Sequence, residues 1–262
     1  MDAPLLPLPI GGGVPSEHRL TPAELAHWRE HGYVVAKGVF SADEAAALRS
    51  EAHALVERLR DTGQAPAVGT QKDGGWASGS LVDEGPRALD GCHNVQFHSA
   101  LFSRMVCDPR LVERASDIIG PNVQLHHTKL FIKPPEIGAP FPMHQDVPYF
   151  EHESHSMIAA VVHFDESTIE KGCIRVVPGS WQRGRLDHIG EGGHHLEVEE
   201  YPVEQATPCE AEPGDVLFFS YLCIREWPVR AFRVQGLSVA CAAPVSSHLR
   251  FVPAATCAQT LH

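Results

Sequence analysis

The pattern of the chain changes once, at Gly120-Pro121, from helix-forming segments to short strands. From Val123 onward, short apolar runs alternate with Gly/Pro turns, and strands are expected at 123–133, 157–164, 173–177, 215–224 and 232–242. Helices followed by strands are typical of an α+β chain with a mostly antiparallel sheet or barrel. We therefore expect an α+β fold that is mainly β, with its helices on the N-terminal side.

Capping signals define the expected helices. Thr21, Pro22 and Glu24 form a capping box with proline at the first position, so a helix is predicted to His31, where Gly32 ends it. A strand should follow at 33–35. Ser41 is expected to cap a second helix over 42–60, and a third is expected over roughly 99–119.

The remaining segments are expected to be irregular. Residues 61–90 are rich in glycine and indicate a loop. Residues 1–19, rich in Pro and Gly, indicate a flexible tail. We find no internal repeat, so residues 20–262 are predicted to form a single domain.

Charge and cysteine content exclude some functions. The 262 residues hold 21 Lys+Arg and 33 Asp+Glu, a formal net charge of −12, which argues against a nucleic-acid or anionic-membrane partner. The longest apolar runs, such as 157–162, are too short for a membrane span. The start shows no signal-peptide pattern, and the seven cysteines are scattered without a Cys-x-x-Cys pair. A cytoplasmic location is expected.

His144-Gln145-Asp146 is the candidate chemical motif. In an extended segment, residues i and i+2 point to the same side, so one imidazole and one carboxylate share a direction. They would supply two of the three ligands of a 2-His-1-carboxylate iron site, which leaves positions open for cosubstrate and oxygen. On the tripeptide alone, a histidine in a surface turn is the alternative.

Three blocks give this motif a context: 128–150 with the His-Gln-Asp motif, Lys171-Gly-Cys-Ile-Arg-Val-Val-Pro-Gly-Ser180, and Gly214-Asp-Val-Leu-Phe-Phe219. In order and spacing they resemble the phytanoyl-CoA dioxygenase family. The opening 25–35 is similar to that family as well, and the resemblance covers roughly 20–224.

The resemblance implies a double-stranded β-helix (jelly-roll) core that holds Fe(II) and uses 2-oxoglutarate and O₂, as a dioxygenase that hydroxylates a small organic substrate. His144 and Asp146 match the first two metal ligands, and Lys129 either faces the cosubstrate or is a solvated strand lysine. Variable loops, here 61–90 and 183–208, would form the substrate pocket. The family name does not identify the substrate, because fold does not fix substrate.

The family's third ligand is a histidine within Ile-His-Gly-Ser-Gly, and Arg225 stands in its place. A guanidinium stays protonated and has no lone pair to donate, so Arg225 cannot ligate iron. The third ligand is therefore unassigned. Candidates are His163, His188 and the pair His194-His195, each of which is as readily a surface or structural histidine.

The family's 2-oxoglutarate arginine lies on the strand after that histidine, where it pairs with a carboxylate. Arg230 and Arg233 both lie near this position, and Arg233 is preferred because it falls inside the expected strand. For both, the alternative is a solvated positive face.

The composition also changes at this point, because no Asp, Glu or Lys follows Glu226. One possible coding sequence for Ile-His-Gly-Ser-Gly is ATC CAC GGG AGT GGC C. Loss of the bases CA from its histidine codon gives ATC CGG GAG TGG CC. This reads Ile-Arg-Glu-Trp-Pro, the sequence found at 224–228. We therefore hypothesise a two-base frameshift. On that hypothesis the strand at 232–242 should lack evolved packing and form a weakened or exposed sheet edge.

Three functions are compatible with these features. The first is an Fe(II)/2-oxoglutarate dioxygenase. The second is a catalytically impaired family member, with Arg225 in place of the second metal histidine. The third, based only on the 17 histidines, is a metal-binding or isomerase-type barrel that uses other histidines.

Overall fold

The computed structural model describes residues 17–61, 68–70, 90–132, 141–149, 156–189, 195–227 and 235–242. Most of the expected N-terminal tail, the substrate-loop residues 71–89, and the segment 228–234 with Arg230 and Arg233 lie outside this part. None of the helices in the described part is long and apolar enough to cross a membrane.

The described residues of the N-terminal half form the helices α1 (Pro22–His31), α2 (Ala42–Asp61), α3 (Ala100–Val106) and α4 (Pro109–Ile119). The capping box of Thr21 and Glu24 is present, and Gly32 ends α1 at φ 79°. Ser41 accepts from the backbone N–H of Glu44. The expected single helix 99–119 is wrong, because Asp108 caps a new helix whose first residue is a proline. The described residues also contain the 3₁₀ turns η2 (Val95–Phe97), η3 (Val147–Tyr149), η4 (Ser180–Arg183) and η5 (Val203–Gln205).

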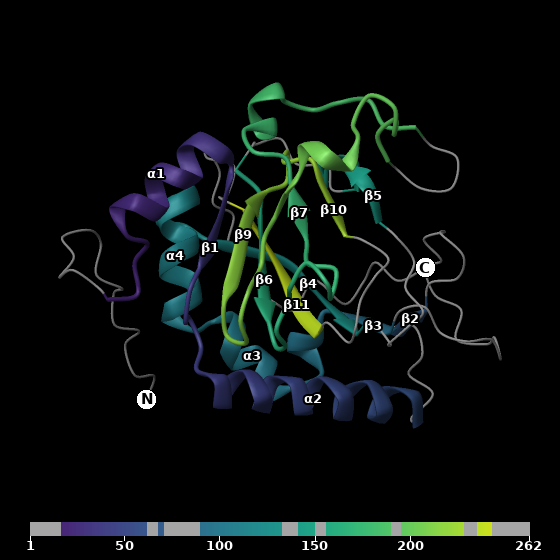
Figure 1. Cartoon of the computed structure of the whole chain (residues 1–262). Helices are drawn as coiled ribbons and strands as arrows, with labels where there is room; N and C mark the ends of the chain where they lie inside the picture. Colours follow the sequence, from purple (N-terminus) through teal and green to yellow (C-terminus); the bar gives the residue numbers. More distant parts are fainter. Residues whose placement is uncertain are drawn as a thin grey trace, which may run out of the picture.

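Two antiparallel sheets form the β part (Figure 1). The larger sheet has the order β1-β9-β6-β11-β4-β3-β2 and the smaller β5-β10-β7-β8. The strands are β1 (Tyr33–Ala36), β2 (Val68–Thr70), β3 (Asp90–His93), β4 (Gln124–Ile132), β5 (Phe141–His144), β6 (Ile158–His163), β7 (Arg175–Val176), β8 (Thr207–Pro208), β9 (Val216–Ser220), β10 (Arg225–Trp227) and β11 (Gln235–Ala242). The expected α+β organisation is confirmed.

Several expected boundaries were wrong. The segment 61–90 is not only loop, because β2 and the first residue of β3 lie in it. The expected strand 215–224 ends at Ser220 and is followed by a turn, after which β10 begins at Arg225. The expected strand 173–177 is reduced to two residues.

Strand β11 lies inside the large sheet and not at its edge. It pairs with β4 from Gln235 to Ala242 and with β6 from Gly236 to Cys241, and Val239 is 1% exposed. The exposed or weakened edge expected at 232–242 is therefore wrong. A strand hydrogen-bonded on both sides leaves no open backbone to pair with another chain.

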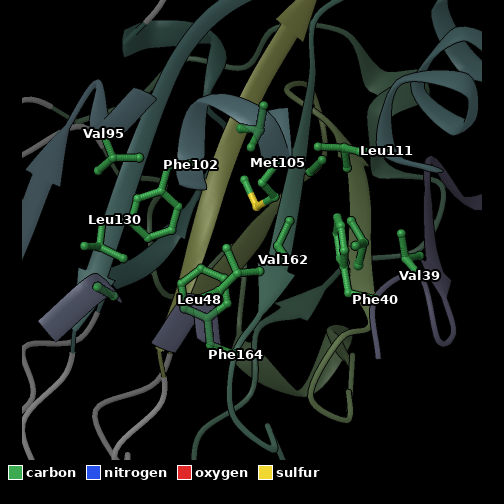
Figure 2. Close-up of a cluster of buried hydrophobic side chains, with 14 of the residues drawn as sticks. Val39, Phe40, Leu48, Val95, Phe102, Met105, Leu111, Leu130, Val162 and Phe164 are labelled. Atoms are coloured by element: carbon green, nitrogen blue, oxygen red, sulfur yellow. The ribbon is translucent and has the colours of Figure 1, made fainter. Parts of the chain in front are cut away.

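One face of the large sheet packs against the helices. Alternate residues of β6 and β9, including Val162 and Phe218, join side chains from α2, α3 and α4 in one buried cluster. Figure 2 shows Phe102 of α3 beside Phe164, and their ring centroids lie 6.1 Å apart. Burying a large apolar side chain contributes about 1.5–3 kcal/mol, so this cluster fixes the sheet against the helices.

The opposite face of the large sheet packs against the small sheet. Val161 of β6 and Leu217 and Phe219 of β9 cluster with Val176 of β7 and Trp227 of β10. On β4, Leu130 belongs to the helix-side cluster, so its neighbour Lys129 points to the small-sheet side, as does His127. The space between the two sheets is therefore where polar side chains of β4, β5 and β10 can meet.

The turn before β9 is tightly fixed. Gly214 adopts φ 94°, and a Cβ at this position would lie 2.0 Å from the carbonyl oxygen of Phe40. The carbonyl of Gly214 also accepts from the N–H of Phe40, at 3.0 Å. The carboxylate of the next residue, Asp215, pairs with Lys37 at 2.8 Å and accepts from the N–H of Gly38. This turn joins β9 to the segment that follows β1.

Candidate functional site

His144 and Asp146 lie where the small sheet meets the turn after β9. His144 ends β5 and is the register partner of Arg225 on β10. The N–H of Asp146 donates to the carbonyl of Tyr221 at 2.9 Å. Antiparallel partners place their side chains on the same face, so the fold brings His144, Asp146 and Arg225 together.

Gln145 holds the motif in place from the opposite side. Its fully buried side chain donates to the carbonyls of Gly184 and Leu222, at 2.8 and 2.7 Å, and accepts from the N–H of Leu186 at 2.8 Å. These bonds tie β5 to the 184–188 loop and to the turn that precedes Arg225. The residue was not singled out from the sequence, although strand alternation directs it away from its two neighbours.

His144 is a buried, neutral imidazole. Its Nδ1 lies 2.6 Å from the carbonyl oxygen of Pro142. Because a carbonyl only accepts, Nδ1 carries the hydrogen and Nε2 keeps its lone pair on the side of Asp146. Burial, and then the charge of Arg225, lower the pKa of His144 to about 3. The ring can therefore act as a ligand at neutral pH.

Arg225 pairs directly with the carboxylate of the motif. Its Nη2 lies 2.5 Å from Oδ1 of Asp146, and the two side chains are 16% and 13% exposed. The same Oδ1 is 3.7 Å from Nε2 of His144. The guanidinium carbon also lies 5.0 Å from the ring centroid of Phe219, within the range of a cation–π contact. The positive charge is thus held beside both candidate ligands.

Lys129 belongs to the same cluster. Burial, and then Arg225, lower the pKa of Lys129 to about 7, whereas Asp146 acts in the opposite direction. Burial lowers the pKa of His127, two residues earlier on β4, to about 4. At neutral pH the site therefore combines neutral imidazoles, one carboxylate, the Arg225 guanidinium and a lysine that is only partly protonated.

Among the described residues, none of the other candidate histidines completes a three-ligand group with His144 and Asp146. Nε2 of His188 accepts from the N–H of Gln145 at 2.9 Å, and its Nδ1 lies 2.9 Å from the carbonyl of Leu186, so both ring nitrogens are used. His163 is buried on β6; its main-chain N–H donates to the carbonyl of Asp215, and its ring Nδ1 has no hydrogen-bond partner among the described residues. Nδ1 of His195 contacts the carbonyl of Leu196, and His194 lies outside the described residues.

These residues do not fit an iron ion. Among the residues that the structure describes, no three His, Cys, Asp or Glu side chains are placed to hold a metal. A guanidinium already neutralises Asp146 on the side where a metal cation would pair with it. Since arginine has no lone pair to offer, the arrangement supplies two ligands and a competing cation.

The model of the family described as phytanoyl-CoA dioxygenase (PhyH) matches residues 28–224. The chain belongs to the phytanoyl-CoA dioxygenase family. The match contains His144, Gln145 and Asp146 and ends one residue before Arg225.

Among curated relatives, the peroxisomal phytanoyl-CoA dioxygenase of Rattus norvegicus is 28% identical over 212 residues, which is 75% of this chain and 60% of the rat protein. The ectoine dioxygenase of Bordetella parapertussis is 27% identical over 209 residues, 75% of this chain and 63% of that protein. The chain thus spans about 60% of the length of these relatives.

Solved structures share the fold. EctD from S. alaskensis with 2-oxoglutarate and 5-hydroxyectoine has a TM-score of 0.69 at 20% identity, over 89% of this chain and 79% of that chain. The epimerase SnoN in complex with Fe³⁺, alpha ketoglutarate and nogalamycin RO has a TM-score of 0.65 at 20% identity, over 88% and 91%. The likeness extends beyond Ile224, to most of the chain.

Proposed function

We propose that this chain is a catalytically impaired member of the family, in which the Arg225 guanidinium stands in place of the metal. One observation carries the proposal: Nη2 of Arg225 lies 2.5 Å from Oδ1 of Asp146. A pair this short, with both side chains mostly buried, opposes a second cation at the same carboxylate. Iron and 2-oxoglutarate, which solved relatives hold, would find an incomplete site here.

The proposal includes the expected family background. We propose a double-stranded β-helix core in one domain from residue 20 to 262 and an ancestral role as an Fe(II)/2-oxoglutarate dioxygenase acting on a small organic substrate. The two facing antiparallel sheets support that core. The five cysteines whose side chains the structure describes are free thiols, which supports a reducing compartment such as the cytoplasm.

An active dioxygenase is the second candidate. It is favoured by the family match over 28–224 and by His144, whose Nε2 lone pair faces Asp146. For iron to bind, Arg225 would have to leave Asp146, and a further group would have to complete the ligand set.

An anaerobic titration with Fe(II) and then 2-oxoglutarate separates the two candidates, by the charge-transfer absorbance of the iron–2-oxoglutarate complex. We expect no band for the wild-type chain and a saturating band for Arg225→His. The matched control is Arg49→His, because Arg49 pairs with Asp165 at 2.8 Å outside the site; it should show no band. Addition of His144→Ala to Arg225→His should abolish the band.

A saturating wild-type band that disappears in His144→Ala would reject the impairment. If no variant shows a band, the segment after Ile224 does not build the site even with a histidine present. That result would be the one expected if a frameshift gave rise to this segment.

We also propose that residues 225–262 arise from the two-base frameshift. The end of the family match at Ile224 supports this, and the central, fully paired position of β11 weighs against it. Renewed sequencing of the DNA is the test. A reading with no restorable His-Gly-Ser-Gly frame after the codon for Ile224 would reject the proposal.

A further inference from the structure

The C-terminal half of α1 carries two histidines at a spacing that suits a metal ion. His27 and His31 are four residues apart, so their side chains are neighbours on one face of the helix. Their ring centroids lie 4.4 Å apart, with an interplanar angle of 63°. Two imidazoles at positions i and i+4 are the arrangement by which a helix supplies two ligands to zinc. This pair is carried by α1, whereas the cluster around Asp146 is built on the two sheets.

A buried tyrosine packs against both rings. Gly32, at φ 79°, ends α1, and the next residue, Tyr33, begins β1 beside the helix (Figure 1). The ring centroid of Tyr33 lies 5.0 Å from that of His27 and 6.3 Å from that of His31. Tyr33 is 7% exposed and lies in a strand that is paired with β9, so it forms a rigid wall. Because this wall limits the orientations of the two imidazoles, they lose less conformational entropy when a metal joins them.

The other side of the pair is open to solvent and favours a cation. The side chain of His31 is 29% exposed, and His27 is partly exposed as well. Oε2 of Glu30 lies 3.8 Å from Nε2 of His31, and His31 is the last residue of α1, where the helix dipole is negative. No third His, Cys, Asp or Glu side chain of the described residues is placed to complete a ligand set. Water would therefore fill the remaining coordination positions, and Glu30 would supply charge without direct ligation.

We propose that His27 and His31 together bind one divalent transition-metal ion, of the kind that prefers imidazole ligands, at the C-terminal end of α1. Imidazole suits Zn²⁺, Ni²⁺ and Cu²⁺, whereas Mg²⁺ and Ca²⁺ prefer oxygen ligands. Since the spacing of the pair exists only in the helix, the ion binds the folded chain in preference to the unfolded chain and stabilises it. The carbonyl of His31 accepts from the N–H of Gly179 at 2.9 Å, so the ion would strengthen a turn to which the 179–184 segment is attached. The site is independent of the proposed function.

Isothermal titration calorimetry of the untagged chain with Ni²⁺, in a buffer that does not bind metals, tests the proposal. We expect a saturable site whose Kd rises at least about tenfold in His27→Gln and in His31→Gln. His53→Gln is the matched control, because His53 is an exposed histidine on α2; it should leave this Kd unchanged, as should His144→Ala. Mg²⁺ should give no saturable heat. At a tenfold excess over the Kd, Ni²⁺ should raise the Tm of the wild-type chain by about 3–6 °C, and it should not raise that of the double variant.

The proposal is overturned if Ni²⁺ gives no saturable heat, or if His27→Gln and His31→Gln bind it as tightly as the wild-type chain. Loss of the site in His144→Ala but not in His27→Gln would also reject it, since the ion would then lie between the two sheets. Binding of Mg²⁺ as tight as that of Ni²⁺ would show that oxygen atoms, and not the two imidazoles, hold the ion. None of these results bears on the iron titration, so this inference and the proposed function fail separately.

Discussion

Removal of Arg225 should show how much its ion pair with Asp146 contributes to the stability of the fold. In Arg225→Ala, Asp146 keeps its charge at 13% exposure but loses the guanidinium 2.5 Å away. Loss of one partner of a buried pair costs about 3–5 kcal/mol. Because Lys129 lies close enough to compensate in part, we expect about 3 kcal/mol. At about 2–4 °C per kcal/mol, the Tm should fall by about 6–12 °C.

Urea denaturation and calorimetry of a double-mutant cycle with Asp146→Asn measure this effect. The double variant should be about 1–2 kcal/mol more stable than Arg225→Ala alone, since no unpaired charge is then buried. The control Arg49→Ala removes an arginine that is 48% exposed from its pair with Asp165, and should cost about 0–1 kcal/mol. Equal losses for Arg225→Ala and Arg49→Ala, or strict additivity in the cycle, would refute the reasoning.

Three further predictions concern the fold around the site. Burial lowers the pKa of His163 to about 4, so the folded state binds fewer protons than the unfolded state and the free energy of unfolding falls as the pH drops from about 6.5 to 4. His163→Gln should reduce this slope by about 1.4 kcal/mol per pH unit, measured by urea titrations at several pH values. Gly214→Ala should lower the free energy of unfolding, measured by denaturant titration, by about 3 kcal/mol or more, because its Cβ would meet the Phe40 carbonyl. Gly38→Ala, at φ 59° with open space, should lower it by about 1 kcal/mol, and equal losses would contradict this reasoning. Gln145→Leu removes the side-chain partner of the buried Leu222 carbonyl and of two part-buried groups, the Gly184 carbonyl and the Leu186 N–H, and should cost about 3 kcal/mol or more. Gln182→Leu, which loses one exposed bond of 3.4 Å, should change stability by no more than about 0.5 kcal/mol. A small effect at Gln145 would show that the loop it holds is not tied to β5.

Local signals in the sequence predicted local structure well. The capping box at Thr21 and the left-handed Gly32 act within one helical turn, so α1 could be placed almost to the residue. The break between α3 and α4 carried an equally local signal, Asp108 before Pro109, that the helical periodicity obscured. Such features need no knowledge of the rest of the fold.

Long-range features could not be predicted in the same way. β2 and β3 each contain a glycine and are strands because β4 pairs with β3, which in turn pairs with β2. The sequence indicated that Arg225 cannot ligate a metal, but only the antiparallel register with His144 shows that it reaches Asp146. His144, Asp146 and Lys129 were predicted as site residues and do lie in one cluster, whereas Arg233 lies outside the described residues.

The position of β11 has a consequence for biosynthesis. This strand separates β4 from β6, although it follows both by many residues in the chain. During translation, β4 and β6 are therefore complete long before the strand that joins them leaves the ribosome, and each presents an open hydrogen-bonding edge in the meantime. Closure of the sheet is a late event of high contact order, so the nascent chain depends on its C-terminal segment to leave an aggregation-prone state.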